Sequence, residues 1–372
     1  MAGIKHANGP NTPNAKSLPN SEGSDPKEKV RIAVLGASGY AGIETIRILL
    51  QHPRIDLALV TSHQYVGKRV SDLYPGLSGK CDMVLEDIDA EKIAAESDFT
   101  FTALPHETST TVVASLLERG QRVIDLSADF RLHDAESYRR WYREHQRPEF
   151  LPQAIYGLTE IHRRKIAPAS LVANPGCYPT GALLGLAPLF MRKLVAGTVV
   201  IDAKSGVTGA GRSSAVELSF SEVHDNFKAY NVAVHRHTPE IEQELSEIAG
   251  ETVAVLFAPH LLPINRGILS TMYVNLKKEP TENELTAIYR EFYEGEPFVR
   301  IVPQGRFPET KDVRGSNDCA IGFRYDPRTH RLVVITAIDN LVKGAAGQAV
   351  QNLNVMCGWP EAEGLRTPAL IP

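Results

Sequence analysis

The sequence feature that most constrains the fold is a glycine-rich string between a short apolar run and a helical pattern. Residues 31–35 are mostly apolar, and from Ile43 onward apolar residues recur at helical spacing. A strand, a tight turn and a helix in this order aim backbone amides and the positive helix end at one place, which suits a pyrophosphate. We therefore predict a dinucleotide-binding turn that consists of Gly36, Ala37, Ser38, Gly39, Tyr40, Ala41 and Gly42.

Two kinds of strand pattern follow this turn. Short apolar runs that alternate with helix-compatible segments lie at residues 55–60, 99–103, 122–126 and 171–173. Longer runs of alternating or β-branched character lie at residues 198–203, 252–257, 268–276 and 332–338. The first kind is typical of a parallel sheet with both faces covered, and the second of an antiparallel or mixed sheet.

The sequence thus predicts an α/β fold, in which a Rossmann-type parallel sheet domain is joined to a second α+β domain with a mixed or antiparallel sheet. Helical patterns at 239–248 and 282–292 are expected to cover one face of the second sheet. We place the dinucleotide-binding domain at residues 30–176 together with 340–372, because the last helical pattern is expected to pack back on it. The catalytic and dimerisation domain is placed at 177–339.

Composition and charge limit the classes of partner. The chain has 372 residues, 43% of them apolar and 23% charged, with a formal net charge of −4. It lacks the Lys/Arg runs with which nucleic-acid and membrane-surface binders contact phosphates. We expect a small-molecule substrate and copies of the chain itself as partners, with no nucleic acid and no membrane.

The cysteines and the N-terminus indicate a reducing compartment. Cys81, Cys177, Cys319 and Cys357 lie far apart without a C-x-x-C pair, which favours reduced thiols over a disulfide framework or a metal site. No window approaches the roughly 18 apolar residues that a membrane span requires. Residues 1–29 have almost no large apolar side chains and are predicted to be a mobile tail. A cytoplasmic protein is expected, with an organellar location left open.

The end of the second predicted strand bears on the choice of nicotinamide cofactor. An NAD site usually has an Asp or Glu about 20 residues after the glycines, which bonds the ribose hydroxyls. Here the strand ends in Val60, Thr61, Ser62 and His63, without a carboxylate. Ser62 and His63 would accommodate a 2′-phosphate, so the sequence predicts NADP(H).

Cys177 is the candidate nucleophile. It stands in the string NPGCYPT at residues 174–180, just before an Ala/Leu-rich helical pattern. Pro179 suits a first helical turn, which places Cys177 at or just before a helix N-terminus. Unpaired amides and the positive dipole end favour thiolate there, so we expect Cys177 to be reactive and the other cysteines to be ordinary thiols.

Several strings stand in a fixed order along the chain. They are VLGASGYAG (34–42), ALPH (103–106), DLSADFRL (125–132), NPGCYPT (174–180), DAKSGVTGAGR (202–212), HRHTPE (235–240) and DNLVKGAA (339–346). Together they resemble the N-acetyl-γ-glutamyl-phosphate reductase family of the aspartate-semialdehyde dehydrogenase superfamily, over nearly everything after residue 30. One departure is Glu107 and Thr108, where the family often has glycine, so the resemblance leaves the shape of this loop open.

The resemblance implies NADPH-dependent reduction of N-acetyl-L-glutamyl 5-phosphate to N-acetyl-L-glutamate 5-semialdehyde and phosphate, in arginine biosynthesis. The residues are consistent with that chemistry, because attack by Cys177 on an acyl phosphate expels phosphate and leaves a thioester, which hydride from the nicotinamide then reduces. The resemblance also implies a homodimer or homotetramer. It places the nicotinamide end of the cofactor near Gly209, Ala210, Gly211 and Asn340.

An anionic substrate needs cationic and polar partners, and several lie in or beside the motif loops. The candidates are Arg131, Asn174, Tyr178, Lys204, Ser205, Arg212, His235 and Arg266. For each cation, a structural ion pair is the alternative.

His235 and His237 compete for the role of acid and base. His237 directly precedes Thr238 and Pro239, which form a helix-start string in which Thr238 can cap and Pro239 can take the first position. A side chain at that end can face the helix start that bears Cys177. The sequence therefore favours His237 as the acid/base, and His235 as a structural group or substrate ligand.

Two alternatives stay open. The lysine-pathway homologue reduces a carrier-linked aminoadipyl phosphate and would use the same catalytic strings. A non-catalytic protein that senses NADP(H) would keep the glycine turn, but it would have no reason to combine Cys177 with His237.

Overall fold

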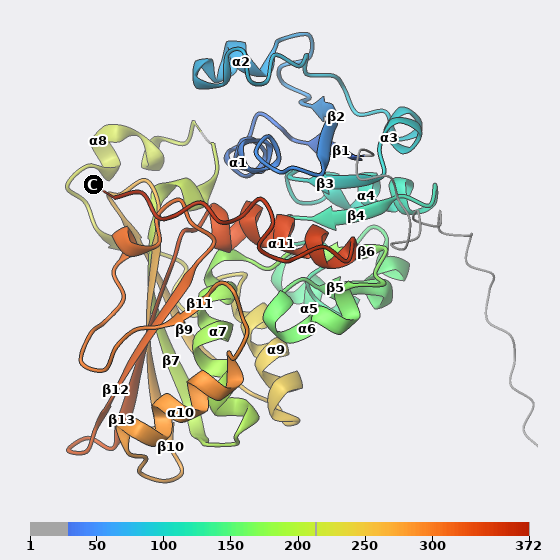
Figure 1. The fold of residues 1–372 in the computed structure, drawn as a ribbon. Helices are drawn as coiled ribbons and strands as arrows, with labels where there is room; N and C mark the ends of the chain where they lie inside the picture. Colours follow the sequence, from blue (N-terminus) through green and yellow to red (C-terminus); the bar gives the residue numbers. More distant parts are fainter. Residues whose placement is uncertain (1–28, 213, 372) are drawn as a thin grey trace, which may run out of the picture.

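The computed structural model describes residues 29–212 and 214–371, and all of the predicted tail except Lys29 lies outside these residues. The described chain forms two sheets that lie one above the other in Figure 1, with helices around and between them. Between residues 29 and 371, position 213 aside, no helix is long and apolar enough to cross a membrane.

Six parallel strands form the first sheet, in the order β2, β1, β3, β4, β6 and β5. The strands are β1 (Val30–Leu35), β2 (Ile55–Thr61), β3 (Phe99–Thr102), β4 (Arg122–Asp125), β5 (Ala154–Tyr156) and β6 (Leu171–Ala173). The helices of this part are α1 (Tyr40–Leu49), α2 (Val70–Leu73), α3 (Ala90–Glu96), α4 (Thr108–Leu117), α5 (Ala135–Trp141) and α6 (Thr159–Ile166). The strand order reverses at β1, and the glycine-rich turn follows this strand. In open α/β sheets this is where ligands bind.

Seven strands form the second sheet, in the order β11, β12, β13, β10, β7, β9 and β8. They are β7 (Val195–Gly206), β8 (Lys228–Ala229), β9 (Val255–Leu262), β10 (Ile268–Leu276), β11 (Val299–Ile301), β12 (Cys319–Asp326) and β13 (Arg331–Ile338). The helices of this part are α7 (Cys177–Met191), α8 (Phe220–Val223), α9 (Thr238–Ala249) and α10 (Glu282–Phe292). The β7–β9 and β11–β12 pairs are parallel and the other pairs are antiparallel, so this sheet is mixed.

The predicted fold class is confirmed, with differences in individual strands. The sequence patterns did not predict β5, β8, β11 or β12; three of these four have only two or three residues, too few for a periodic signal. The run predicted at 252–257 is displaced, because pairing with β7 begins at Val255 and continues to Leu262.

Two helical segments link the two parts of the molecule: α7 follows the last strand of the first sheet, and the final segment returns from the second sheet to the first. Helix α7 is buried nearly all round and packs on β10 and β13 as well as on α9. The final helical segment consists of a π-helix, η6 (Val342–Ala346), and then α11 (Gly347–Met356). Val350 and Leu353 of α11 join the core of the first sheet with Ile46 and Phe99. In Figure 1, α11 accordingly lies beside the first sheet, although it follows β13 of the second.

Candidate active site

The glycine-rich turn is shaped for close approach of its backbone. Gly36 has a φ of +80°, and a Cβ built there would lie 2.3 Å from the carbonyl oxygen of Ala103. Helix α1 begins at Tyr40 and points its N-terminus at this turn. The backbone and the helix end together can hold a pyrophosphate, so the residues present fit a dinucleotide.

The end of β2 lies beside this turn. Ser62 Oγ is 2.8 Å from Ser38 Oγ, within hydrogen-bond distance. The His63 side chain is 94% exposed, and its Nδ1 lies 3.7 Å from Asp87 Oδ1. The sequence analysis looked for a carboxylate only at the end of the second strand and therefore missed Asp87. This carboxylate belongs to a separate segment that pairs beside β2.

The loop after β7 extends from the second sheet to the glycine-rich turn. Arg212 Nη1 donates to the Ser38 carbonyl at 3.2 Å and to Tyr74 Oη at 3.3 Å. Its guanidinium also lies over the rings of Tyr65 and Tyr74. Arg212 therefore points toward the cofactor turn and not toward Cys177.

Cys177 is the first residue of α7, with Gly176 as the N-cap. It lines a pocket of about 650 Å³. The predicted site residues that line the same pocket are Tyr178, Ser205, Gly209, Ala210, His235 and His237. The fold thus brings the predicted nucleophile, both candidate histidines and the loop predicted to face the nicotinamide to one pocket.

A buried carboxylate joins the two helix starts. Glu240 lies in the first turn of α9 and accepts the Gly176 amide at 2.7 Å and Tyr156 Oη–H at 2.7 Å. His237 is the N-cap residue of α9, so this bond aligns the helix ends that carry Cys177 and His237. Gly176 is required there, because a Cβ on it would lie 2.6 Å from His237 Nε2.

The predicted cap of α9 is wrong in detail. Thr238 is the first helical residue and not the cap, and its Oγ1 has no hydrogen-bond partner among the described residues. Pro239 consequently occupies the second position. His237 takes the cap position because its amide turns back to donate to His235 Nδ1 at 3.0 Å.

Burial controls the ionisation of the central pair. It raises the pKa of Cys177 to about 11, and the opposing effects of the Arg131 charge and of backbone hydrogen bonds do not cancel this rise. Burial thus opposes the thiolate that the helix start favours at Cys177. Burial, with the charges of His235 and Arg131, holds the pKa of His237 well below its usual value. A neutral thiol thus shares the pocket with a neutral imidazole.

The other predicted cations have protein partners. Arg266 pairs with Glu44 of α1 at 2.7 Å and lies 3.6 Å from Asp339. Lys204 pairs with Asp202 at 2.8 Å. These contacts support the ion-pair alternative for both residues.

The polar candidates also have internal partners. Tyr178 Oη lies 2.9 Å from Tyr230 Oη, and Ser205 Oγ donates to the Gly206 carbonyl. Asn174 donates to the Ala345 carbonyl. Asn340 accepts the Gly267 amide and donates to Thr208 Oγ1, which ties the start of the last helical segment to the loop after β7.

Several residues of the site were missed from the sequence. One is Glu240, which joins the helix starts, and among those that line the pocket are His106, Tyr142, Lys228, Tyr230 and Arg236. Neither Glu240 nor the lining residues carry a local signal, since the partners of Glu240, Gly176 and Tyr156, lie 64 and 84 residues away along the chain.

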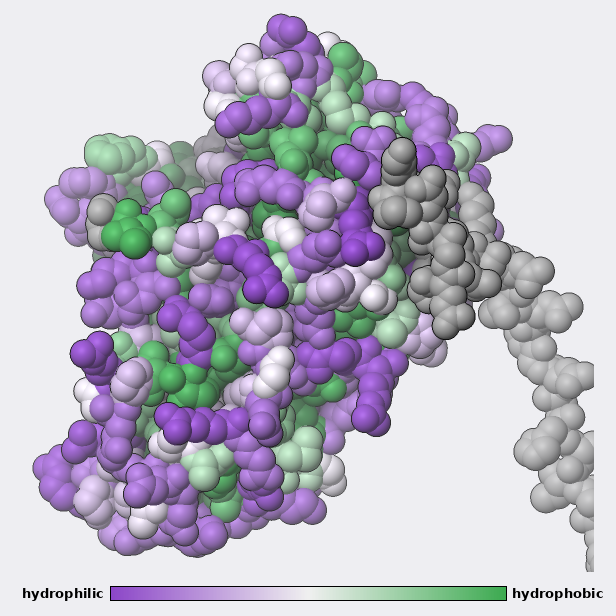
Figure 2. Space-filling model, viewed as in Figure 1, coloured by the Kyte–Doolittle hydropathy of each residue, from purple (hydrophilic) through white to green (hydrophobic). Residues whose placement is uncertain are grey.

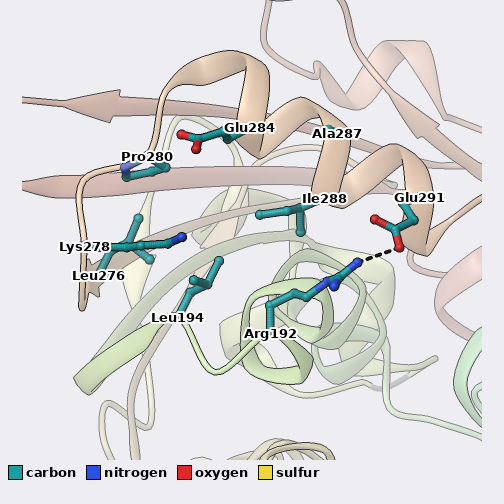
Figure 3. Close-up of a pocket in the computed structure, with 9 residues that line it drawn as sticks. All are labelled: Arg192, Leu194, Leu276, Lys278, Pro280, Glu284, Ala287, Ile288 and Glu291. Carbon is teal, nitrogen blue, oxygen red and sulfur yellow. Dashed lines mark ion pairs between the residues drawn. The ribbon is translucent and has the colours of Figure 1, made fainter.

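Two other features lie outside this pocket. A hollow of about 370 Å³ between α10 and the end of β10 is lined by aliphatic and charged side chains, with Arg192 paired to Glu291 (Figure 3). His133, Glu244 and Glu247 bring possible metal-ligand atoms within 4.8 Å of one another. However, Lys165 already pairs with Glu247, and His162 with Glu244.

Comparisons with known proteins define the class. The family model of the semialdehyde dehydrogenase NAD binding domain matches residues 31–169, and that of the semialdehyde dehydrogenase dimerisation domain matches residues 177–340. Solved structures with the same fold include aspartate semialdehyde dehydrogenase II from Vibrio cholerae, complexed with ASA (TM-score 0.67, 17% identity, 89% of this chain and 99% of the other). Another is the Candida albicans aspartate semialdehyde dehydrogenase with NADP (TM-score 0.68, 15% identity, 89% and 99%). The chain thus has the fold and both domains of the semialdehyde dehydrogenase class.

Sequence relatives narrow the class to one family. N-acetyl-gamma-glutamyl-phosphate reductase of Geotalea daltonii is 54% identical over 345 residues, covering 92% of this chain and all of the relative. The enzyme of the same name from Pelotomaculum thermopropionicum is 53% identical over 92% of this chain and 99% of its own length. The chain belongs to the N-acetyl-gamma-glutamyl-phosphate reductase family.

Proposed function

We propose that this protein reduces N-acetyl-L-glutamyl 5-phosphate to N-acetyl-L-glutamate 5-semialdehyde and phosphate with NADPH. The observation that carries the proposal is the pocket in which Cys177 and His237 start two helices that Glu240 joins. Family membership, at more than half identity over nearly the full chain, supports the same reaction.

The cofactor would lie along the glycine-rich turn and the loop after β7. Gly36 and the start of α1 would hold the pyrophosphate, and Ser38, Ser62 and Arg212 surround the place where a 2′-phosphate would lie. When bound, NADPH supplies the hydride. Gly209 and Ala210 line the Cys177 pocket, which supports their predicted place beside the nicotinamide.

The chain's own residues would perform the acyl transfer. His237 takes the proton of Cys177, the thiolate sulfur bonds to the acyl carbon, and the carbon–oxygen bond to phosphate breaks. The thioester accepts hydride, the carbon–sulfur bond then breaks, and Cys177 recovers its proton from His237. Arg236 and Lys228 line the pocket and supply cationic groups for the substrate.

The decisive experiment follows the reverse reaction. We expect NADP reduction with N-acetyl-glutamate semialdehyde plus phosphate, and much less with the aminoadipate analogue. Turnover with the analogue alone would favour the lysine-pathway reading. No turnover with either substrate from folded, NADP-binding protein would favour the sensor.

Cys177→Ser tests the covalent step. An alcohol without a strong base is a far poorer nucleophile, so turnover should fall by several orders of magnitude while NADP binding and the unfolding midpoint are kept. Cys81→Ser is the matched control. Cys81 lies in the core of the first sheet, so this variant should remain active. Near-normal turnover of Cys177→Ser would reject the mechanism.

The protein should act as a homodimer or homotetramer. The match to a dimerisation domain over residues 177–340 supports self-association. Val216, Phe220, Phe227 and Val234, in and around α8, are each more than half exposed, and Figure 2 shows pale green atoms at the place of α8 in Figure 1. Exposed apolar patches of this kind commonly mark interfaces. Light scattering of the purified protein should give two or four times the chain mass, and a monomer would contradict this.

The cytoplasm is the expected location. All four cysteines are free thiols in the structure, which supports a reducing compartment. Fractionation with an antibody against the chain tests this.

A further inference from the structure

Arg131 carries a buried positive charge beside the Cys177 turn. The residue is 7% exposed, and its carboxylate partner Glu240 is 1% exposed. Nε donates to the Asn174 carbonyl at 2.8 Å, Nη2 to the Leu126 carbonyl at 2.8 Å, and Nη1 to Glu240 Oε2 at 3.4 Å. These bonds use all three nitrogens of the guanidinium, so Arg131 is held in place and is not free to swing out to a substrate anion.

The same guanidinium also lies beside the imidazole of His237. Nη1 lies 3.5 Å from His237 Nε2. A guanidinium has no acceptor, so in a hydrogen bond between the two groups Nε2 accepts and its single lone pair is directed at Arg131. The positive charge therefore lies next to both the thiol turn and the candidate base.

Both groups lie against the backbone that carries the thiol. A Cβ built on Gly176 would be 2.6 Å from His237 Nε2 and 2.9 Å from Arg131 Nη1. Cys177 is the next residue, and the Gly176 amide is bonded to Glu240. The positive charge, the ring of His237 and the start of α7 therefore converge on one point.

We propose that Arg131 is the positioning residue of this centre: fixed by Glu240 and two backbone carbonyls, it holds a positive charge beside the start of α7 that stabilises the thiolate of Cys177. This inference rests on the proposed function in one respect, namely that Cys177 is the nucleophile.

The charges around Cys177 predict opposite effects for the two partners. Arg131 lowers the pKa of the thiol, whereas Glu240 raises it. The other titratable or charged groups that line this pocket are His106, Tyr142, Tyr178, Glu217, Lys228, Tyr230, His235, Arg236 and His237. These groups are present in all the variants below. If the Arg131 and Glu240 variants change the reactivity of Cys177 in opposite directions, the difference therefore comes from the charges of Arg131 and Glu240.

The test measures how fast iodoacetamide alkylates Cys177 at pH 8, with the modified peptide quantified by mass spectrometry. Only thiolate reacts, so the rate reports the thiolate fraction without any turnover. Arg131→Met should slow alkylation at least about tenfold, and Glu240→Gln should accelerate it about threefold or more. A merely structural role would change both rates in the same direction.

Two further variants keep the test decisive. Arg131→Met leaves Glu240 buried without its partner and can fail to fold, so Arg131→Met/Glu240→Gln removes both charges. This double variant should remain folded and stay slower than Glu240→Gln alone. Arg131→Lys keeps the positive charge but cannot make all the hydrogen bonds of the guanidinium. Cys177 of this variant should be alkylated at a rate between those of the wild type and Arg131→Met.

The control is Arg139→Met, which removes an arginine whose ion pair with Glu136 is largely exposed and should leave the rate unchanged. An unchanged or faster rate in Arg131→Met, or a rate in Arg131→Lys as low as in Arg131→Met, would overturn the proposal. The proposed function would survive that result, because it is decided by turnover of the wild-type protein with the acyl-phosphate pathway substrates.

Discussion

At the scale of single residues, His237 and His235 differ in what surrounds them. His237 faces Gly176 and Arg131 through Nε2, whereas His235 accepts the His237 amide through Nδ1. His235 also has the rings of Tyr178 and Phe257 around it. One histidine is thus aimed at the thiol turn, and the other supports it.

His237→Ala should lose about 10²–10⁴-fold in kcat, the usual range for a positioned acid/base, with a much smaller change in KM. Burial, His235 and Arg131 lower the pKa of His237 below 6.5, so the imidazole stays neutral and able to accept a proton in mildly acidic solution. The ratio of wild-type to His237→Ala turnover should therefore persist as the pH is lowered through 6.5. His235→Ala is the matched comparison, and a larger kcat loss there than in His237→Ala would exchange the two roles.

Glu107 is a strained residue in the loop before α4. Its φ is +71° and its ψ is −45°, a backbone conformation that an L side chain rarely adopts. The loop is held because the Glu107 amide donates to the buried carboxylate of Asp129 at 2.9 Å. The loop is thus built as glycine would build it, although this chain has glutamate there.

Glu107→Gly should raise the free energy of unfolding by about 1 kcal/mol, because relief of about 1–3 kcal/mol of strain outweighs the greater freedom of the unfolded chain. Urea unfolding measures this. Glu136→Gly, in α5, is the control and should destabilise by about 1 kcal/mol. A destabilised Glu107→Gly would show that the exposed Glu107–Arg143 ion pair matters more than the strain.

At the scale of elements, the π-helix η6 supports the start of α7. The buried Lys343 of η6 pairs with the equally buried Glu160 of α6 at 2.6 Å. Gly344 lies against the nucleophile, since a Cβ built on it would be 2.9 Å from Cys177 Cβ. The sequence pattern predicted a continuous helix over this segment, and the π-turn is where it differs.

Gly344→Ala should therefore displace Cys177 and lower kcat by about tenfold to a hundredfold, because sub-ångström placement governs reactivity. NADP affinity should change little, since the glycine-rich turn is not involved. Gly76→Ala is the control, because a Cβ there meets nothing within 4 Å. Full activity of Gly344→Ala would mean that the backbone of η6 shifts to make room for the methyl group and that the thiol of Cys177 stays in place.

At the scale of the whole molecule, the two sheets are joined by an ion-pair bridge. Arg266, in the loop between β9 and β10, binds Glu44 of α1 through two hydrogen bonds of 2.7 and 3.0 Å. Glu44 is nearly fully buried and also pairs with Arg47, while Asp339 approaches Arg266 from the other side. The helix of the cofactor turn is thereby tied to the sheet that bears the loop after β7.

Arg266→Met should lower the free energy of unfolding by about 2–3 kcal/mol, because it leaves Glu44 with one partner fewer in a buried place. The double variant Glu44→Gln/Arg266→Met should cost less than the sum of the two single variants, as measured by urea unfolding. Arg139→Met removes an exposed pair and should cost no more than about 1 kcal/mol. If the double variant lost as much free energy of unfolding as the two single variants together, Glu44 and Arg266 would not be coupled across the two sheets.

The sequence by itself determined what depends on local patterns. Runs of apolar residues specified both sheets, because strand periodicity is a property of neighbouring residues. Glycines between a strand and a helix marked the turn at Gly36, and Pro179 marked the helix start at Cys177, because turns and helix ends also have local signals.

Only the tertiary structure decided which groups meet and how they ionise. Arg131 and Arg266 look alike in the sequence, yet one contacts His237 and the other Glu44, because each partner lies more than 100 residues away along the chain. The helix start favours thiolate at Cys177, but burial raises its pKa, and burial is set by the packing of distant segments. A local pattern can name a reactive residue, whereas its charge state depends on the desolvation and the neighbouring charges that folding brings to it.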